Sequence, residues 1–320
     1  MFKGNRKLIA AAAGLSMTLV AAGCGNDNNE ENNNTNDMNN DGDNNANENA
    51  DAGDDGAMVG EGKEIELVYV EWDSEIASTH VMEKVLEDQG YDVTITPIDN
   101  AIMWQSVANG EADGMVAAWL PATHGDLFDE YEDSLVDLGV NLEGALVGLV
   151  VPEYMDIDSI GELDQYEDEL GGTITGIEPG AGVVQAAEAA VDDYGLDGFS
   201  VETSSSGAMA TELGTAFENE EPIVVTGWTP HWKFSAYDLK YLEDPEGSFG
   251  DAEVIQTMVR EGLEDDMPNA YRILDQFFWT TEDMESVMLE IEEGVDAADA
   301  AADWVEANQD TVDEWLEGVE

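Results

Sequence analysis

From Lys63 onward, strand-like and helix-like segments alternate, and this alternation constrains the fold more than any other feature of the sequence. Apolar and β-branched residues predict strands over 65–70, 91–97 and 114–120. Helical spacing predicts helices near 77–86 and over 101–109. The order β-α-β-α-β is typical of a parallel sheet covered by helices.

A second unit repeats the same order. Strands are predicted over 173–177, 199–203 and 222–228, and helices over 183–194 and 208–217. We predict that the remainder, from Ala252 to Gly318, is helical throughout. Its three tryptophans are expected to pack in the core, and they are Trp279, Trp304 and Trp315.

Two such units predict an α/β protein of two lobes, each a mostly parallel sheet flanked by helices, with a ligand cleft between them. We expect residues 63–150 to form the first part of lobe 1 and residues 151–244 to form lobe 2. Residues 245–320 are then C-terminal helices that pack on lobe 1. A strand at 146–151 is expected to cross between the lobes, and 241–245 to cross back.

Residues 1–23 resemble the signal peptide of a bacterial lipoprotein. Lys3, Arg6 and Lys7 precede an apolar run over 8–22 of about 15 residues, which is shorter than the ~20 needed to cross a bilayer. Small residues lead into Cys24, the expected lipidation site. We therefore expect a protein held by lipid at the extracellular face of the cell membrane, although an ordinary secretion signal remains an alternative.

The segment after the signal consists of Asn, Asp, Glu and Gly with scarcely any apolar residue. Such a composition cannot bury enough surface to fold. We expect residues 24–62 to be a disordered acidic tether with a root-mean-square span of roughly 35 Å.

The charge of the chain excludes several classes of partner. Six of the nine basic residues and all 74 acidic ones follow Gly23, so the mature chain carries a formal charge of −68. A nucleic acid would require clustered Lys and Arg, and so would an anionic lipid surface. Such self-repulsion is tolerable where salt screens it, which predicts a salt-rich habitat. A wholly disordered chain is disfavoured because 43% of the residues are hydrophobic and eight are Trp.

Three tryptophans lie where predicted strands end, namely Trp72, Trp119 and Trp228. In open α/β sheets the carboxyl ends of the strands line the ligand crevice. Three ring faces that meet there suit a quaternary ammonium, which cannot donate hydrogen bonds but is attracted by each ring by roughly 0.5–2 kcal/mol. The alternative is that each indole simply fills the core.

An anion site is predicted where Gly180-Ala181-Gly182-Val183 opens a helix after a strand, because free backbone N–H groups there can bind a carboxylate. The run partly matches the dinucleotide pattern G-x-G-x-x-G, but Gln185 occupies the third glycine position. A plain tight turn is the alternative. His124 follows the Trp119 strand and could donate a hydrogen bond to the same carboxylate, and a solvated loop histidine is the alternative.

Signatures of catalysis and metal binding are missing from the sequence. His80, His124 and His231 share no metal-ligand spacing, and Cys24 is the only cysteine. There is no Gly-x-Ser-x-Gly elbow and no His-Glu-x-x-His. We therefore expect neither an enzyme nor a cofactor or metal.

From Lys63 to the C-terminus the sequence resembles the glycine betaine-binding lipoproteins of ABC importers, the OpuAC-like substrate-binding proteins. The resemblance lies in the segments 71–78, 118–124, 176–182 and 226–232. At the position of Ala181 the family often has Ser, and at the position of Val183 it often has Ile. The resemblance implies that Val183 contacts the ligand through its backbone, so the change of side chain there is mild.

This resemblance implies a type II periplasmic-binding-protein-like fold that closes on its ligand. It implies that Trp72, Trp119 and Trp228 box the trimethylammonium group, and that the amides of Gly182 and Val183 hold the carboxylate together with the His124 side chain. Glycine betaine is the implied ligand, proline betaine a second one, and an ABC permease the partner of a monomeric receptor. A choline or carnitine receptor, a secreted hydrolase and a structural spacer are the alternatives.

Overall fold

The computed structural model describes residues 58–320. The signal peptide, Cys24 and most of the tether predicted from the sequence therefore lie outside the described residues. Within residues 58–320, no helix is both long enough and apolar enough to cross a membrane.

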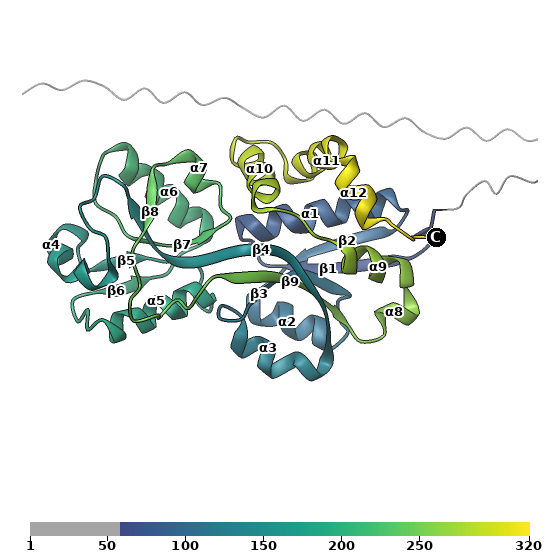
Figure 1. Ribbon diagram of the computed structural model, residues 1–320, viewed down its shortest axis with the longest axis horizontal. Helices are drawn as coiled ribbons and strands as arrows, with labels where there is room; N and C mark the ends of the chain where they lie inside the picture. Colours follow the sequence, from purple (N-terminus) through teal and green to yellow (C-terminus); the bar gives the residue numbers. More distant parts are fainter. Residues whose placement is uncertain (1–57) are drawn as a thin grey trace, which may run out of the picture. The chain divides into compact units, whose positions relative to one another are not determined.

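The first sheet contains three parallel strands, β1 (Glu64–Tyr69), β2 (Asp92–Pro97) and β3 (Gly114–Leu120). Strand β9 (Glu253–Arg260) runs antiparallel to β3 and to the first part of β4 (Leu135–Pro152), so the order is β2-β1-β3-β9-β4. We call this sheet and its helices lobe 1 (Figure 1). The helices are α1 (Asp73–Asp88), α2 (Asn100–Ala108) and α3 (Gly125–Tyr131), followed by the short 3₁₀ turn η1 (Glu132–Ser134).

The second sheet, lobe 2, joins β5 (Thr173–Thr175), β6 (Ser200–Glu202), β7 (Val225–Thr229) and β8 (Leu239–Tyr241) to the second part of β4. Strands β6, β5 and β7 are parallel, and β4 is antiparallel to both β7 and β8. The flanking helices are η2 (Ile160–Tyr166), α4 (Glu167–Leu170), α5 (Gly182–Asp193), α6 (Ser206–Glu218) and α7 (Lys233–Ala236). Each sheet has one antiparallel strand among parallel ones, which confirms the α/β class and makes both sheets mixed.

Strand β4 belongs to both sheets (Figure 1). It pairs with β9 as far as Ala145 and with β7 from Leu146 onward. Three register shifts interrupt the β9 pairing, and Gly139 and Gly144 beside them have positive φ angles of 97° and 83°. Glycine adopts this backbone conformation without steric cost, and such irregularities bend a strand. One curved strand thereby connects the lobes.

The prediction that residues 252–318 are helical throughout is wrong, because β9 lies inside the lobe 1 sheet, between β3 and β4. Val254, Ile255, Thr257 and Val259 are β-branched and favour a strand. The segment is eight residues long and is followed at once by helices. Its short strand pattern was therefore not distinguished from the amphipathic helical pattern of the residues that follow. Those helices are α8 (Leu263–Asp266), α9 (Pro268–Gln276), α10 (Thr281–Glu292), α11 (Ala297–Ala307) and α12 (Gln309–Trp315).

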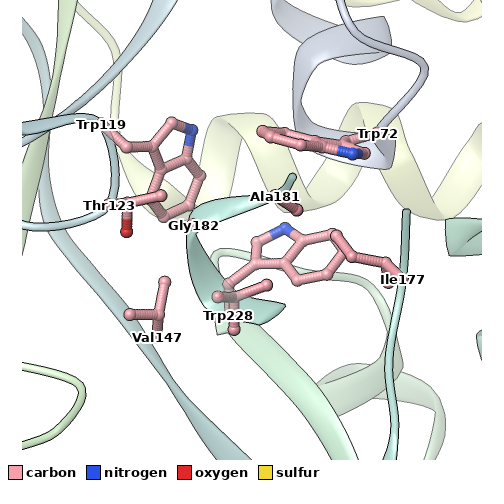
Figure 2. A pocket seen from close by; sticks show the side chains of 9 residues that line it. Trp72, Trp119, Thr123, Val147, Ile177, Ala181, Gly182 and Trp228 are labelled. Atoms are coloured by element: carbon pink, nitrogen blue, oxygen red, sulfur yellow. The ribbon is translucent and has the colours of Figure 1, made fainter. Parts of the chain in front are cut away.

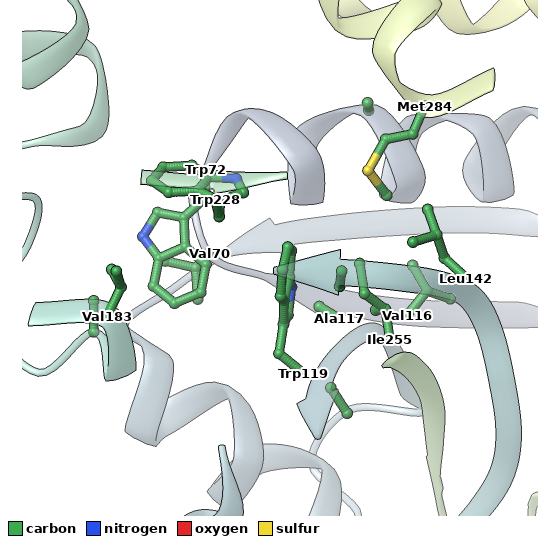
Figure 3. Packing of buried hydrophobic residues seen from close by; sticks show 14 of the residues in the cluster. Val70, Trp72, Val116, Ala117, Trp119, Leu142, Val183, Trp228, Ile255 and Met284 are labelled. Carbon is green, nitrogen blue, oxygen red and sulfur yellow. The ribbon is translucent and has the colours of Figure 1, made fainter. Parts of the chain in front are cut away.

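The C-terminal helices pack against α1 of lobe 1. Trp304 stacks on Trp315 with a centroid separation of 5.7 Å, and Trp279 meets Trp304 edge to face at 5.6 Å. All three are buried, so their predicted core role is confirmed. The apolar core continues through the sheet from Leu142 and Ile255 toward the tryptophans at the strand ends (Figure 3).

Candidate functional site

A small cavity lies where strand ends of lobe 1 face lobe 2. It is lined by Trp72, Trp119, Thr123, Val147, Ile177, Ala181, Gly182, Val183 and Trp228. The space between them is about 290 Å³, including the part that opens to solvent. Figure 2 shows the three indoles pointing into this space from different sides. No ionisable side chain is among the lining residues, although the chain carries 74 acids.

Trp72 reaches the cavity from the start of lobe 1, between β1 and α1, where it is the N-cap residue of the helix. Its Nε1–H donates to the Glu178 carboxylate of lobe 2 at 3.1 Å. The hydrogen bond ties the indole edge to the other lobe and leaves the ring face directed at the cavity.

Trp119 belongs to β3, which is buried along its whole length. Its Nε1–H donates at 2.7 Å to Oε1 of Glu75, a fully buried residue of α1. Burial raises the pKa of the Glu75 carboxyl to about 8, although the hydrogen bonds from Trp119 and Ser74 oppose the shift. Glu75 therefore orients the indole without placing a full charge in the core at neutral pH.

Trp228 belongs to β7 and is the contribution of lobe 2 to the cage. Its ring meets the edge of His231 with centroids 4.7 Å apart and planes at 73°. This contact places the His231 ring against the Trp228 indole. The Nε1 atom of Trp228 has no hydrogen-bond partner within residues 58–320.

His124 lies behind the cavity and is not one of the lining residues. Its ring stacks on Trp72 at 6.0 Å and meets Trp104 edge to face at 5.6 Å. The Trp119 amide donates to Nδ1 at 3.0 Å, so this hydrogen bond assigns the ring proton to Nε2. Nε2 is buried without a partner among the described residues, and burial lowers the pKa of His124 to about 3. The ring is therefore a neutral donor at physiological pH.

Gly182 and Val183 form the first turn of α5 at one wall of the cavity. The amides of Val184 and Gln185 donate to the Ala181 carbonyl, whereas those of Gly182 and Val183 have no backbone acceptor in the described chain. This is the arrangement expected at a helix start, where free N–H groups and the helix dipole favour an anion.

Gly182 also lets the two lobes touch. A Cβ atom at this position would lie 2.2 Å from the Thr123 carbonyl oxygen and 2.7 Å from Thr123 Cγ2. Thr123 belongs to the loop after β3, and Glu253 of β9 accepts from the amides of Ala122 and Thr123 at 2.7 Å each. A glycine is required here because the loop is held rigidly against it.

Asp73, next to Trp72, makes further contacts between the lobes. Its carboxylate accepts from Ser206 Oγ and Trp232 Nε1, both at 2.8 Å, and lies 3.5 Å from His231 Nε2. Burial alone would raise the pKa of Asp73, but the nearby His231 ring and the hydrogen bonds from Trp232 and Ser206 hold it well below its usual range. An ionised carboxylate of lobe 1 thus holds two residues of lobe 2 by hydrogen bonds beside the cavity.

Five of the six ligand-contacting residues predicted from the sequence line one cavity, and His124 lies behind Trp72. Sequence reasoning missed the acceptors Glu75 and Glu178, although both lie within the motifs that carried the resemblance. It also missed Glu253, because that residue was assigned to a helix. Within residues 58–320 no cluster of three His, Cys, Asp or Glu side chains could hold a metal ion.

The buried neutral state of His124 predicts a pH-dependent stability. The unfolded chain takes up a proton on this residue below about pH 6.5, whereas the folded protein does so only near pH 3. Between pH 6 and pH 4 the wild type should therefore lose about 1.4 kcal/mol of unfolding free energy per pH unit relative to His124→Gln. Urea unfolding of both proteins at several pH values measures this, and a constant difference would contradict the assignment.

The chain matches known proteins over the two lobes. Residues 63–307 match the family described as the substrate-binding domain of ABC-type glycine betaine transport systems. Over 178 residues the chain is 50% identical to the glycine betaine/carnitine transport binding protein GbuC of Listeria monocytogenes. This match covers 55% of the present chain and 57% of that protein, so it spans little more than half the length of the curated relative.

Two solved structures are similar over nearly their whole length. Lactococcal OpuAC, in a closed conformation complexed with glycine betaine, has 50% identity and a TM-score of 0.76, covering 79% of this chain and 99% of that one. An ABC-transporter choline binding protein in complex with choline has 26% identity and a TM-score of 0.76, covering 80% and 92%. The resemblance inferred from the motifs is confirmed. The chain belongs to the family of substrate-binding domains of ABC-type glycine betaine transport systems.

Proposed function

We propose that this protein captures glycine betaine outside the cell and delivers it to the permease of an ABC importer. The observation that carries the proposal is one cavity with two kinds of wall. Three indoles surround it, and two unpaired amides of a helix start lie beside them. A small molecule that combines a methylated ammonium with a carboxylate satisfies both walls.

The indole cage suits the trimethylammonium end of the ligand. Trp72, Trp119 and Trp228 are each less than a tenth exposed, so the ligand would be largely desolvated between them. A desolvated cation–π contact contributes about 2 kcal/mol per ring, more than an exposed one. Glu75 accepts a hydrogen bond from the indole N–H of Trp119, and Glu178 accepts one from that of Trp72. These bonds fix the two rings by their edges and leave the ring faces free for the ligand.

The carboxylate of the ligand is assigned to the start of α5. The amides of Gly182 and Val183 would donate to it, and the neutral, unpartnered Nε2–H of His124 next to Trp72 is a third candidate donor. Because choline has no carboxylate, it would leave these donors buried and unpaired, which costs free energy. The site therefore favours a betaine over choline, and proline betaine offers the same two groups.

Binding and closure are coupled in this proposal. Trp72 and Trp119 come from lobe 1, whereas Trp228, Gly182 and Val183 come from lobe 2. A ligand that contacts both lobes binds the closed state better than the open one and so shifts the equilibrium toward closure. The permease would recognise the closed form. Lipid on Cys24 would keep the receptor at the outer face of the membrane, and it would release its ligand chemically unchanged.

Removal of one cage ring tests the proposed function. Isothermal titration calorimetry of the wild type in concentrated NaCl should detect saturable binding of glycine betaine. Trp119→Ala should weaken it at least tenfold, about 1.4 kcal/mol. Phe278→Ala removes an exposed aromatic ring that does not line the cavity, and its affinity should equal that of the wild type. Absence of glycine betaine binding by the wild type, or an undiminished affinity of Trp119→Ala for glycine betaine, would contradict the proposal.

Closure is tested at Gly182. A methyl group there collides with the Thr123 carbonyl, so Gly182→Ala should prevent full closure and weaken betaine binding at least tenfold, about 1.4 kcal/mol. Small-angle scattering should record a decrease in radius of gyration on betaine addition for the wild type and not for the variant. Gly207→Ala is the matched control, because a Cβ at Gly207 in α6 meets nothing within 4 Å. Equal compaction of wild type and Gly182→Ala would exclude this role.

A further inference from the structure

A lysine without any hydrogen bond lies against the cage. Lys233 opens helix α7 and is fully buried, with 0% of its surface exposed. Its Nζ atom is 4.2 Å from the centroid of the Trp228 ring and 5.5 Å from that of Phe234. Nζ has no hydrogen-bond partner within residues 58–320. An ammonium group without hydrogen bonds in the interior is unfavourable, so its position requires a reason beyond packing.

Lys233 and the ligand share one indole. Trp228 lines the cavity, but Lys233 does not, so the ammonium meets the ring from outside the cavity. A quaternary ammonium held in the cage would meet the same ring from inside. A protonated Lys233 polarises the Trp228 ring toward itself and so weakens the cation–π attraction between that ring and the ligand. It also repels a second cation directly, because the medium between them has a low dielectric constant.

We propose, building on the betaine-binding function above, that Lys233 is a specificity-determining residue that disfavours net cations such as choline relative to zwitterions. The repulsion acts on the ammonium of either ligand. In a betaine the same lysine also attracts the carboxylate, which lies within the same cavity, so the two effects partly cancel. Choline has no negative group, and it experiences the repulsion alone.

The surroundings leave Lys233 poised between its two protonation states. Burial lowers the pKa of its ammonium to about 7, while the charge of Asp73 on α1 opposes the shift. His231, on the preceding loop, is also buried, and its pKa is lowered to about 4 by burial and by Lys233. His231 is therefore neutral, and Asp73 ionised, across the range in which Lys233 changes charge. Discrimination against choline should accordingly be strongest below pH 7.

The test compares the dissociation constants of choline and glycine betaine at pH 6 by calorimetry. Neither ligand titrates near this pH, and Glu75 behind Trp119 stays protonated because burial raises its pKa to about 8. Lys233→Met should lower the choline-to-betaine ratio of dissociation constants by roughly tenfold, which corresponds to 1.4 kcal/mol. Lys233→Gln, also neutral, should do the same and provides a second chance of a folded variant.

Lys240→Met is the matched control, because it removes one positive charge from lobe 2 at a partly exposed site paired with Asp158. Its ratio should equal that of the wild type. In the wild type alone, the ratio should fall several-fold from pH 5.5 to pH 7 as Lys233 loses its proton.

The outcomes separate the two proposals. If betaine binds but the ratio is the same at both pH values and in every folded variant, Lys233 does not set specificity, while the betaine-binding function stands. If the wild type binds neither ligand, the proposed function fails and the inference fails with it.

Discussion

A fully methylated ammonium has no N–H to donate, so ring faces are the protein groups that can hold it with both affinity and shape. In the proposed function, this constraint accounts for much of the architecture around the cavity. Each indole has to be held edge-on by other residues while one face stays open to the cavity. Glu178 does this for Trp72, Glu75 for Trp119, and the His231 ring packs against Trp228. The positions of the three rings thus depend on hydrogen bonds and packing with residues that do not line the cavity.

The two-lobed fold determines when the cage is complete. Two rings come from lobe 1 and the third from lobe 2, and β4 belongs to both sheets. In the closed arrangement, Asp73 accepts hydrogen bonds from lobe 2 right beside Trp72. The acids of this chain are therefore used in two ways. Most give it its large negative charge, whereas a few buried or partly buried ones orient rings and join lobes, and none lines the cavity itself.

The sequence allowed the general fold and the cage to be predicted, because strand ends in open α/β sheets converge at one edge. Trp72, Trp119 and Trp228 follow or end apolar strands, so local pattern was enough to bring them together. The helix start at Gly182 was equally visible as a glycine turn after a strand. Strand β9 was missed because its eight residues lead directly into a long helical region.

Other features depend on contacts that no local pattern encodes. Asp73 meets Trp232 across 159 positions of the chain, and Glu253 meets Thr123 across 130. With 74 acids in the chain, nothing in the sequence singles out these carboxylates. Lys233 likewise has no local sequence pattern that distinguishes it from an ordinary exposed lysine. Only the packing of α7 against β7 reveals that its ammonium is buried on a cage ring.

The central claim is that three indoles surround one methylated nitrogen. Intermolecular nuclear Overhauser effects measure this directly, with glycine betaine bound to protein in which only the tryptophan rings carry protons. We expect cross-peaks from the ligand methyl protons to the rings of Trp72, Trp119 and Trp228, and none to Trp279, Trp304 or Trp315. Cross-peaks missing from two of the three cage rings, or appearing at the C-terminal tryptophans, would contradict it.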